Sequence, residues 1–398
     1  MDALTTPLPK DWEIKTFRDI STINQGLQIP ISQRLKAPTE HAKFYITIQA
    51  LNNRKEFEYI KTYNESVVCH KDDILMTRTG NTGMVITNIE GVFHNNFFKI
   101  NFDRTLINKD FLVYFLSLEQ TQKTILRKAG TSTIPDLNHN DFYSLSIPLP
   151  PLDEQIVIAN ILSALDRYLY NLDALILKKE SVKKALSFEL LSQRKRLRGF
   201  NQNWQRVRLG TYKYRRGSFP QPYGNPQWYS DNGMPFVQVY DVGENFKLNQ
   251  KTKQKISKIA QPMSVFVPKN SVIITLQGTI GRVALTQYDC YCDRTILIFD
   301  NNTLNDVNKY FFVLSLFTKF EEEKRKADGS IIKTITKQTL KDFEILLPPL
   351  NEQIAIANIL SGLDSEIISL KNKKRQFENI KKALNHDLMS AKIRVLKK

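Results

Sequence analysis

The chain has 398 residues, of which 41% are apolar, and its formal net charge is +17. This length exceeds one ordinary core and predicts two domains with connecting segments. A protein this basic usually meets a polyanion: nucleic acid is the commonest, and a membrane surface is the alternative.

The first domain is expected over residues 1–147 and reads as mixed α/β. A glycine turn at residues 79–83 follows an apolar run, and glycine there would supply positive φ in a hairpin. Polar side chains suited to base edges or phosphates lie in its loops and around this turn. The sequence predicts strands at Phe44–Ile48, Ser66–Cys69, Asp73–Thr77 and Val92–Ile100, a helix near Lys109–Leu118, and DNA contacts by Gln25, Gln28, Arg78, Asn81 and Lys99.

A long helix is predicted in the segment 148–200. Prolines precede it, and Asp153 fits the N-cap position with Glu154 in the first turn. Apolar residues then recur in steps of four and three, which indicates a heptad seam. The seam residues are Ile158, Leu162, Leu165, Leu169, Leu172 and Ile176, and the pattern slips before resuming at Val182, Leu186 and Leu190.

The second domain is expected over residues 201–345, again as mixed α/β. One loop, from residue 213 to 229, is rich in basic, amide and aromatic side chains. Arginine suits guanine and amides suit adenine, so this composition favours base reading. Strands are predicted at Pro235–Tyr240, Ser271–Thr275, Val283–Thr286 and Arg294–Phe299, a helix near Asn308–Phe320, and DNA contacts by Arg215, Arg216, Gln221, Tyr223, Trp228, Tyr229, Gln277, Thr279 and Arg282.

The segment 346–398 repeats the first helical segment. Residues 147–166 and 345–364 match at 16 of 20 positions with an offset of 198. A seam recurs at Ile356, Leu360, Leu363, Ile367 and Leu370, followed by Ile380, Leu384 and Leu388, and Asn351 takes the N-cap position. The helical parts are thus nearly identical, whereas the domains share a skeleton and differ in most side chains. The helices therefore have one shared task, and the domains have the same kind of task on different targets.

Each helix would be about 60–65 Å long, and its apolar stripe needs a partner. A tandem repeat favours a pseudo-twofold arrangement in which the two helices pack antiparallel. The alternative is a coiled coil between copies of the chain. The predicted fold is two α+β domains joined by two long antiparallel coiled-coil helices. Lys178, Lys179, Lys183, Lys184, Arg194, Lys195 and Arg196 could follow phosphates or form a solvated face.

Motifs for chemistry are missing from the sequence. It has no phosphate loop and no methyltransferase cofactor loop, and its five histidines show no metal-ligand spacing. The three cysteines form no disulfide framework, and Cys290 and Cys292 are expected on one face of a strand rather than at a metal. No apolar run reaches 18 residues and the N-terminal segment lacks a signal peptide's features. We therefore expect a non-catalytic cytoplasmic protein without its own cofactor or metal.

The segment Leu149-Pro150-Pro151-Leu152-Asp153-Glu154-Gln155, repeated as Leu347-Pro348-Pro349-Leu350-Asn351-Glu352-Gln353, leads into each long helix. This doubled motif resembles the conserved regions of specificity subunits of type I restriction-modification enzymes. The preceding halves, each opening near a tryptophan and carrying a GxxG turn, are similar to that family's target recognition domains. The resemblance covers essentially the whole chain.

The resemblance implies a subunit that reads a bipartite asymmetric DNA site, one half with each domain, while the helices set the gap. It implies two adenine-methylating subunits as partners, joined by two ATP-driven translocase/nuclease subunits in the restriction enzyme. S-adenosylmethionine, ATP and magnesium would belong to those partners. The family has no transferable motif for base contacts, so the DNA-contact predictions above rest on composition alone.

Two alternatives remain open. One is a fused or stand-alone module that serves a single-chain methyltransferase–nuclease, which the missing catalytic motifs disfavour. The other is a coiled-coil protein–protein scaffold that never touches DNA, which leaves the charge of +17 unexplained. A steep loss of DNA affinity with salt would separate a DNA binder from a scaffold.

Overall fold

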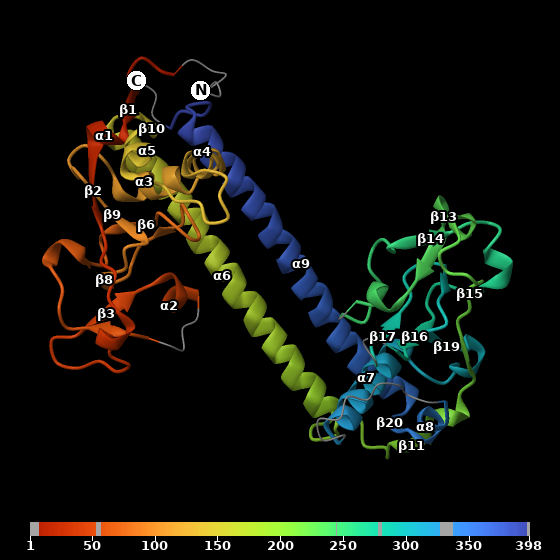
Figure 1. Cartoon of the computed structure of the whole chain (residues 1–398). Helices are drawn as coiled ribbons and strands as arrows, with labels where there is room; N and C mark the ends of the chain where they lie inside the picture. Colours follow the sequence, from red (N-terminus) through yellow and green to blue (C-terminus); the bar gives the residue numbers. More distant parts are fainter. Residues whose placement is uncertain (1–7, 53–56, 244, 278–280, 327–336, 396–398) are drawn as a thin grey trace. The chain divides into compact units, whose positions relative to one another are not determined.

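The computed structural model (Figure 1) describes residues 8–395 except 53–56, 244, 278–280 and 327–336. The chain divides into two compact units, each built from separate stretches of sequence. Unit 1 consists of residues 1–174 and 372–398, and unit 2 consists of residues 175–371.

Unit 1 contains two four-stranded sheets and one two-stranded ribbon. The first sheet has the order β2-β9-β6-β7 and the second the order β4-β3-β8-β5, whereas β1 pairs with β10. All pairs are antiparallel except β3 with β8. The strands are β1 (Glu13–Thr16), β2 (Ser21–Gln25), β3 (Lys43–Ile46), β4 (Tyr59–Ile60), β5 (Val68–Cys69), β6 (Ile74–Thr77), β7 (Val85–Ile86), β8 (Gly91–Phe93), β9 (Phe97–Phe102) and β10 (Ser146–Leu149).

Helices of unit 1 cover the first sheet and enclose an aromatic core. Phe17, Phe98, Phe111 and Phe142 are fully buried there, together with the apolar start of the long helix α6. A smaller core lies at the second sheet around Tyr45. The helices are α1 (Phe17–Ile20), α2 (Ile48–Asn52), α3 (Lys109–Leu116), α4 (Glu119–Ala129) and α5 (His139–Tyr143).

Unit 2 repeats this topology strand for strand. Its sheets have the orders β12-β19-β16-β17 and β14-β13-β18-β15, and β11 pairs with β20. The one parallel pair, β13 with β18, corresponds to β3 with β8. The strands are β11 (Gln205–Arg208), β12 (Tyr214–Arg216), β13 (Tyr229–Val237), β14 (Gln254–Ile256), β15 (Val265–Val267), β16 (Val272–Thr275), β17 (Val283–Leu285), β18 (Cys290–Cys292), β19 (Ile296–Phe299) and β20 (Glu344–Leu347), and the helices are α7 (Lys309–Lys326) and α8 (Lys337–Asp342).

Two 40-residue helices, α6 (Leu152–Leu191) and α9 (Leu350–Met389), each contribute to both units. In unit 1 the beginning of α6 lies beside the end of α9, since Asp166 pairs with Lys381. In unit 2 the end of α6 lies beside the beginning of α9, since Lys183 pairs with Asp364. The helices therefore run antiparallel within each unit, which confirms the predicted fold of two α+β domains with a pair of long antiparallel helices.

The first seams lie on the packed faces of these helices. Among their residues Ile158, Leu162, Leu172, Ile176, Ile356, Leu360 and Ile367 are buried, and Leu165, Leu169, Leu363 and Leu370 are half-buried. The predicted restart of each seam was wrong at its first position. Val182 and Ile380 are 45% and 49% exposed, because burial resumes only at the helix ends, where Leu190 and Leu388 enter the domain cores.

Three local predictions were also wrong. The strand expected over Val92–Ile100 is two strands, because the turn His94–Asn96 sends β8 and β9 into different sheets. Asp153 and Asn351 are not N-caps, since the prolines before them start the helices: the carbonyls of Pro151 and Pro349 accept the Gln155 and Gln353 N–H groups at 3.0 Å.

Candidate nucleic-acid interface

The doubled helix motif forms a junction between domain and helix in each unit. In unit 1 the Glu154 carboxylate, only 1% exposed, accepts the Trp12 indole N–H at 3.0 Å and the Arg394 Nε–H at 2.8 Å. Asp11 shares this guanidinium at 3.0 Å. The hydrogen bonds from Arg394 to Glu154 and then to Asp11 raise the pKa of Arg394. This buried carboxylate, at the start of α6, therefore binds both the first residues of the domain and the segment that follows α9.

Unit 2 repeats the junction with its own residues. Glu352, also 1% exposed, accepts the Trp204 indole N–H at 3.2 Å and the Arg196 Nη2–H at 2.6 Å. Arg196 follows α6, as Arg394 follows α9. In each unit the tail after one long helix is thus tied to the beginning of the other, and a buried acid is stable there because it is fully hydrogen-bonded.

The glutamine of each motif fixes the first helix after the sheet. Gln155 Oε1 accepts the Asn108 N–H at 2.9 Å, and Gln155 Nε2 donates to the Pro150 carbonyl at 2.8 Å. Gln353 makes the same pair of bonds with Asn308 and Pro348. Asn108 is the N-cap of α3, so the motif links two helices through buried amide contacts.

A second polar cluster is also duplicated, about three helical turns after the first along each long helix. In unit 1 the Asp166 carboxylate accepts the Tyr114 hydroxyl at 2.7 Å and pairs with Lys381. In unit 2 the Asp364 carboxylate likewise accepts the Tyr310 hydroxyl and pairs with Lys183. Lys179 pairs with Glu366, Lys195 with Glu189 and Arg196 with Glu352. Lys179 and Lys183 thus join α6 to α9, Arg196 belongs to the junction, and Lys195 pairs with a residue of the preceding helix.

The domains differ where β8 turns into β9 in unit 1. The His94 N–H donates to the Ile46 carbonyl at 3.0 Å, and the Arg78 N–H donates to the Asn96 carbonyl at 2.7 Å. Gln25 Nε2 reaches the Asn95 carbonyl at 3.4 Å. Burial, and then the charge of Arg34, lower the pKa of His94, which favours its neutral form. Backbone and side-chain polar groups from several segments thus meet at this turn, residues 94–96.

The equivalent turn of unit 2 keeps the backbone and changes the side chains. The Asp293 N–H donates to the Val237 carbonyl at 3.0 Å, as His94 does to Ile46. The buried Asp293 carboxylate accepts the hydroxyls of Tyr223 and Thr295. Burial, and then the hydrogen bond to Asp293, raise the pKa of Tyr223. One scaffold therefore presents His94-Asn95-Asn96 in unit 1 and Asp293-Arg294-Thr295 in unit 2.

The predicted contacts of unit 1 fall into two groups. Gln25, Gln28 and Arg78 meet at the turn 94–96, where the Asn95 amide donates to Gln28 Oε1 at 3.1 Å. Arg78 also pairs with Asp136 at 2.7 Å. Asn81 is exposed in the glycine turn, where Gly80 and Gly83 adopt the predicted positive φ of 85° and 91°. Lys99 lies apart, half-buried, and donates to the Val68 carbonyl at 2.7 Å.

The predicted contacts of unit 2 divide similarly. Arg215, Arg216, Gln221 and Gln277 are exposed. Tyr223, Trp228 and Tyr229 are half-buried against the small core around Phe219, and Tyr229 donates to the Tyr223 carbonyl at 2.7 Å. Their rings therefore help to hold the loop in its conformation, because they pack against this core. Arg282 is half-buried and donates to the Val242 carbonyl at 3.0 Å, whereas Thr279 lies outside the described residues.

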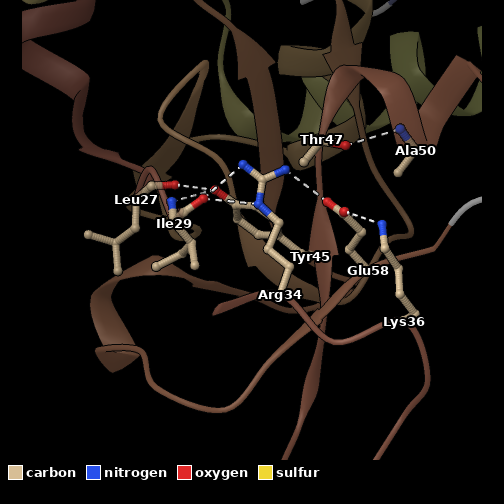
Figure 2. A network of polar contacts seen from close by, with 8 residues as sticks. All are labelled: Leu27, Ile29, Arg34, Lys36, Tyr45, Thr47, Ala50 and Glu58. Atoms are coloured by element: carbon tan, nitrogen blue, oxygen red, sulfur yellow. Dashed lines mark hydrogen bonds and ion pairs between the residues drawn. The ribbon is translucent and has the colours of Figure 1, made fainter. Parts of the chain in front are cut away.

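Sequence reasoning missed the residues that hold these loops in place. Arg34, Tyr45 and Glu58 brace one loop of unit 1 (Figure 2), and Asp293 braces the aromatic loop of unit 2. The sequence signal that could have located these loops is a glycine at the start of each, Gly26 after β2 and Gly217 after β12. These glycines align at an offset of 191 rather than 198, so the dominant repeat concealed them.

Across the residues that the structure describes, no group of three or more His, Cys, Asp or Glu side chains could hold a metal ion. Within the same ranges, no helix is both long and apolar enough to cross a membrane. Cys290 and Cys292 are buried on β18. The class of structure is a duplicated scaffold with different polar loops, tied to a pair of long helices.

Comparisons with known proteins agree with this class. The sequence model of the type I restriction modification DNA specificity domain matches residues 9–180 and 222–379. The putative type I restriction enzyme MjaX specificity subunit of Methanocaldococcus jannaschii is 26% identical, over 98% of this chain and 95% of that protein. The crystal structure of the type I restriction-modification S subunit from M. genitalium has a TM-score of 0.63 at 16% identity, covering 96% of this chain and 98% of that one. A chain from a structure of type I complex assembly and conformational transition has a TM-score of 0.61 at 17% identity, covering 96% and 99%.

Two copies of the family's domain cover most of this sequence. The chain therefore belongs to the type I restriction modification DNA specificity family.

Proposed function

We propose that this chain is the specificity subunit of a type I restriction-modification complex and reads a bipartite asymmetric DNA site. The observation that carries the proposal is the duplication of one scaffold with unlike side chains at equivalent positions, as at residues 94–96 and 293–295. Each unit would read one half-site. The net charge of +17 supports contact with the phosphate backbone, which contributes affinity without sequence information.

The helix pair would set the gap between half-sites and bind partner subunits. Several apolar side chains of α6 and α9 remain exposed, among them Leu177, Phe188 and Ile354, which is typical of a surface that other chains cover. We propose two adenine methyltransferase subunits as these partners, joined by two translocase/nuclease subunits in the restriction complex. S-adenosylmethionine, ATP and magnesium would bind to those partners, and this chain would direct their chemistry in the cytoplasm without catalysing it.

The test is to purify the chain with the methyltransferase subunit from its own genome and to map adenine methylation on DNA exposed to the complex. Methylation at one bipartite motif with a fixed gap is expected. A stable complex without sequence-restricted methylation would support the scaffold alternative. Binding to unrelated duplex should weaken steeply with salt, because each neutralised phosphate releases counterions.

A further inference from the structure

A loop leaves the first sheet at the same place in both units. In unit 1 it follows Gly26, and in unit 2 it follows Gly217. A Cβ atom at Gly26 would lie 2.2 Å from the Phe93 carbonyl oxygen, and one at Gly217 would lie 2.2 Å from that of Cys292. Only glycine fits such an approach to the backbone. The scaffold therefore fixes where each loop starts, while the loops share almost no sequence.

The post-glycine loop of unit 1, residues 27–35, is held at both ends. Leu27 forms a bridge with His94, and Leu35 exchanges two backbone hydrogen bonds with Tyr59 at 2.8 and 2.9 Å. Inside the loop, the buried Tyr45 hydroxyl donates to the Leu27 carbonyl at 2.7 Å and accepts the Ile29 N–H at 3.1 Å. The phenol thus fixes the loop backbone at two points, Leu27 and Ile29.

Arg34 completes the brace from within the loop (Figure 2). Its Nε–H and Nη2–H donate to the Ile29 carbonyl at 2.9 and 2.8 Å, and its Nη1–H donates to Glu58 at 2.9 Å. Burial opposes ionisation of Glu58, but hydrogen bonds from Lys36 and Arg34 hold its pKa below the ordinary value. The loop is therefore ordered before any ligand binds, and little entropy remains to be lost on binding.

The tip of this braced loop carries an unusual pair of side chains. Residues 30–33 are exposed, and Ile31–Gln33 form a single 3-10 turn after Pro30. Ile31 is 74% exposed. Single exposed aliphatic residues are common, but this one stands on a braced turn that also carries the exposed Gln33. In the major groove an A·T pair presents a donor and acceptor on adenine, which an amide matches, and a methyl group on thymine, which an aliphatic side chain matches.

We propose that the post-glycine loop of unit 1 reads an A·T pair, with Ile31 on the thymine methyl group and Gln33 on the adenine edge. Arg34, Tyr45 and Glu58 are positioning residues, since they hold the turn and do not touch the base. This inference rests on the proposed function, because it assumes that unit 1 reads one half-site.

The test uses the assembled complex with the methyltransferase subunits and the site found by methylation mapping. Each thymine of both half-sites is replaced in turn by uracil, which removes only the 5-methyl group. At one thymine, in one half-site, this change should weaken wild-type binding about fourfold, the value of one buried methyl group. For the variant Ile31→Ala the same replacement should have no effect. Gln33→Ala should reduce discrimination at that pair about tenfold.

Ile14→Ala is the matched control, because Ile14 is 64% exposed in the same unit but lies on β1. It should retain the full uracil effect. No uracil effect at any thymine, or a uracil effect that Ile31→Ala leaves unchanged, would overturn the inference while the proposed function stands. If no bipartite motif is found at all, the proposed function itself fails, and this inference with it.

Discussion

At the helix junctions the two units agree closely. Glu154 and Glu352 are equally buried, and each receives an indole N–H and a guanidinium. At the turn between β8 and β9 and its equivalent between β18 and β19 they differ, since His94 in unit 1 has the place of Asp293 in unit 2. The backbone contacts at that place are nevertheless the same. The two units therefore share the contacts that join domain to helix and differ in the side chains at these turns.

This comparison implies that the recognition domains can be exchanged as units. Replacing residues 12–147 by another target recognition domain should switch one half-site completely and leave the other half-site and the gap unchanged. Sequencing of methylated sites from the assembled complex measures this. If both half-sites changed, the two domains would not read their half-sites independently. The different loops of the two units would then not explain two separate specificities.

The junctions should be equally costly to break. Glu154→Ala and Glu352→Ala each remove a buried carboxylate and leave an indole and a guanidinium without their acceptor. We expect each change to lower the free energy of unfolding by about 3 kcal/mol, measured by urea denaturation. Glu13→Ala is the control, since the Glu13 side chain is 67% exposed and its ion pair contributes little. A clearly smaller loss in one unit would show that its junction depends on other contacts.

The tyrosine–aspartate clusters offer a finer comparison. Tyr114→Phe and Tyr310→Phe each delete one hydrogen bond to a carboxylate and keep the ring. Each change should cost about 2 kcal/mol, and the two costs should agree, because Asp166 and Asp364 have the same partners. Thermal unfolding of the two variants measures this. A marked inequality would mean that the duplicated clusters are not equivalent in energy.

A buried thiol gives a smaller effect, visible only in alkali. Burial in unit 1 raises the pKa of Cys69 from 9.0 to about 12. The folded chain then keeps a proton that the unfolded chain loses, so stability should fall as pH rises from about 9 towards 12. Comparing urea unfolding at pH 8 and pH 10, wild type should lose more stability than Cys69→Ala. An equal loss in both proteins would indicate that Cys69 is not the group responsible.

Part of this molecule follows from local sequence. The repeat, the two long helices and their first seams follow from periodicity, since Ile158 and Ile356 must face a partner wherever the domains lie. The glycine turn at residues 79–83 follows from backbone sterics alone. The strands near Asp73–Thr77 and Ser271–Thr275 are equally local, being short apolar runs that end at turns. Their places in the sheets are not local.

The tertiary structure decided what the motif residues do. Trp12 and Glu154 are 142 residues apart and Arg394 lies 240 residues from Glu154, so no local pattern pairs them. The same holds for Tyr45 and Arg34. They can brace the loop only because the fold brings the carbonyls of Leu27 and Ile29 within their reach. The bonds of Lys99 and Tyr229 to carbonyls of their own domains likewise follow from the tertiary structure and not from the composition of a loop. Composition shows which chemistry a loop can offer, whereas packing decides which side chains remain exposed to use it.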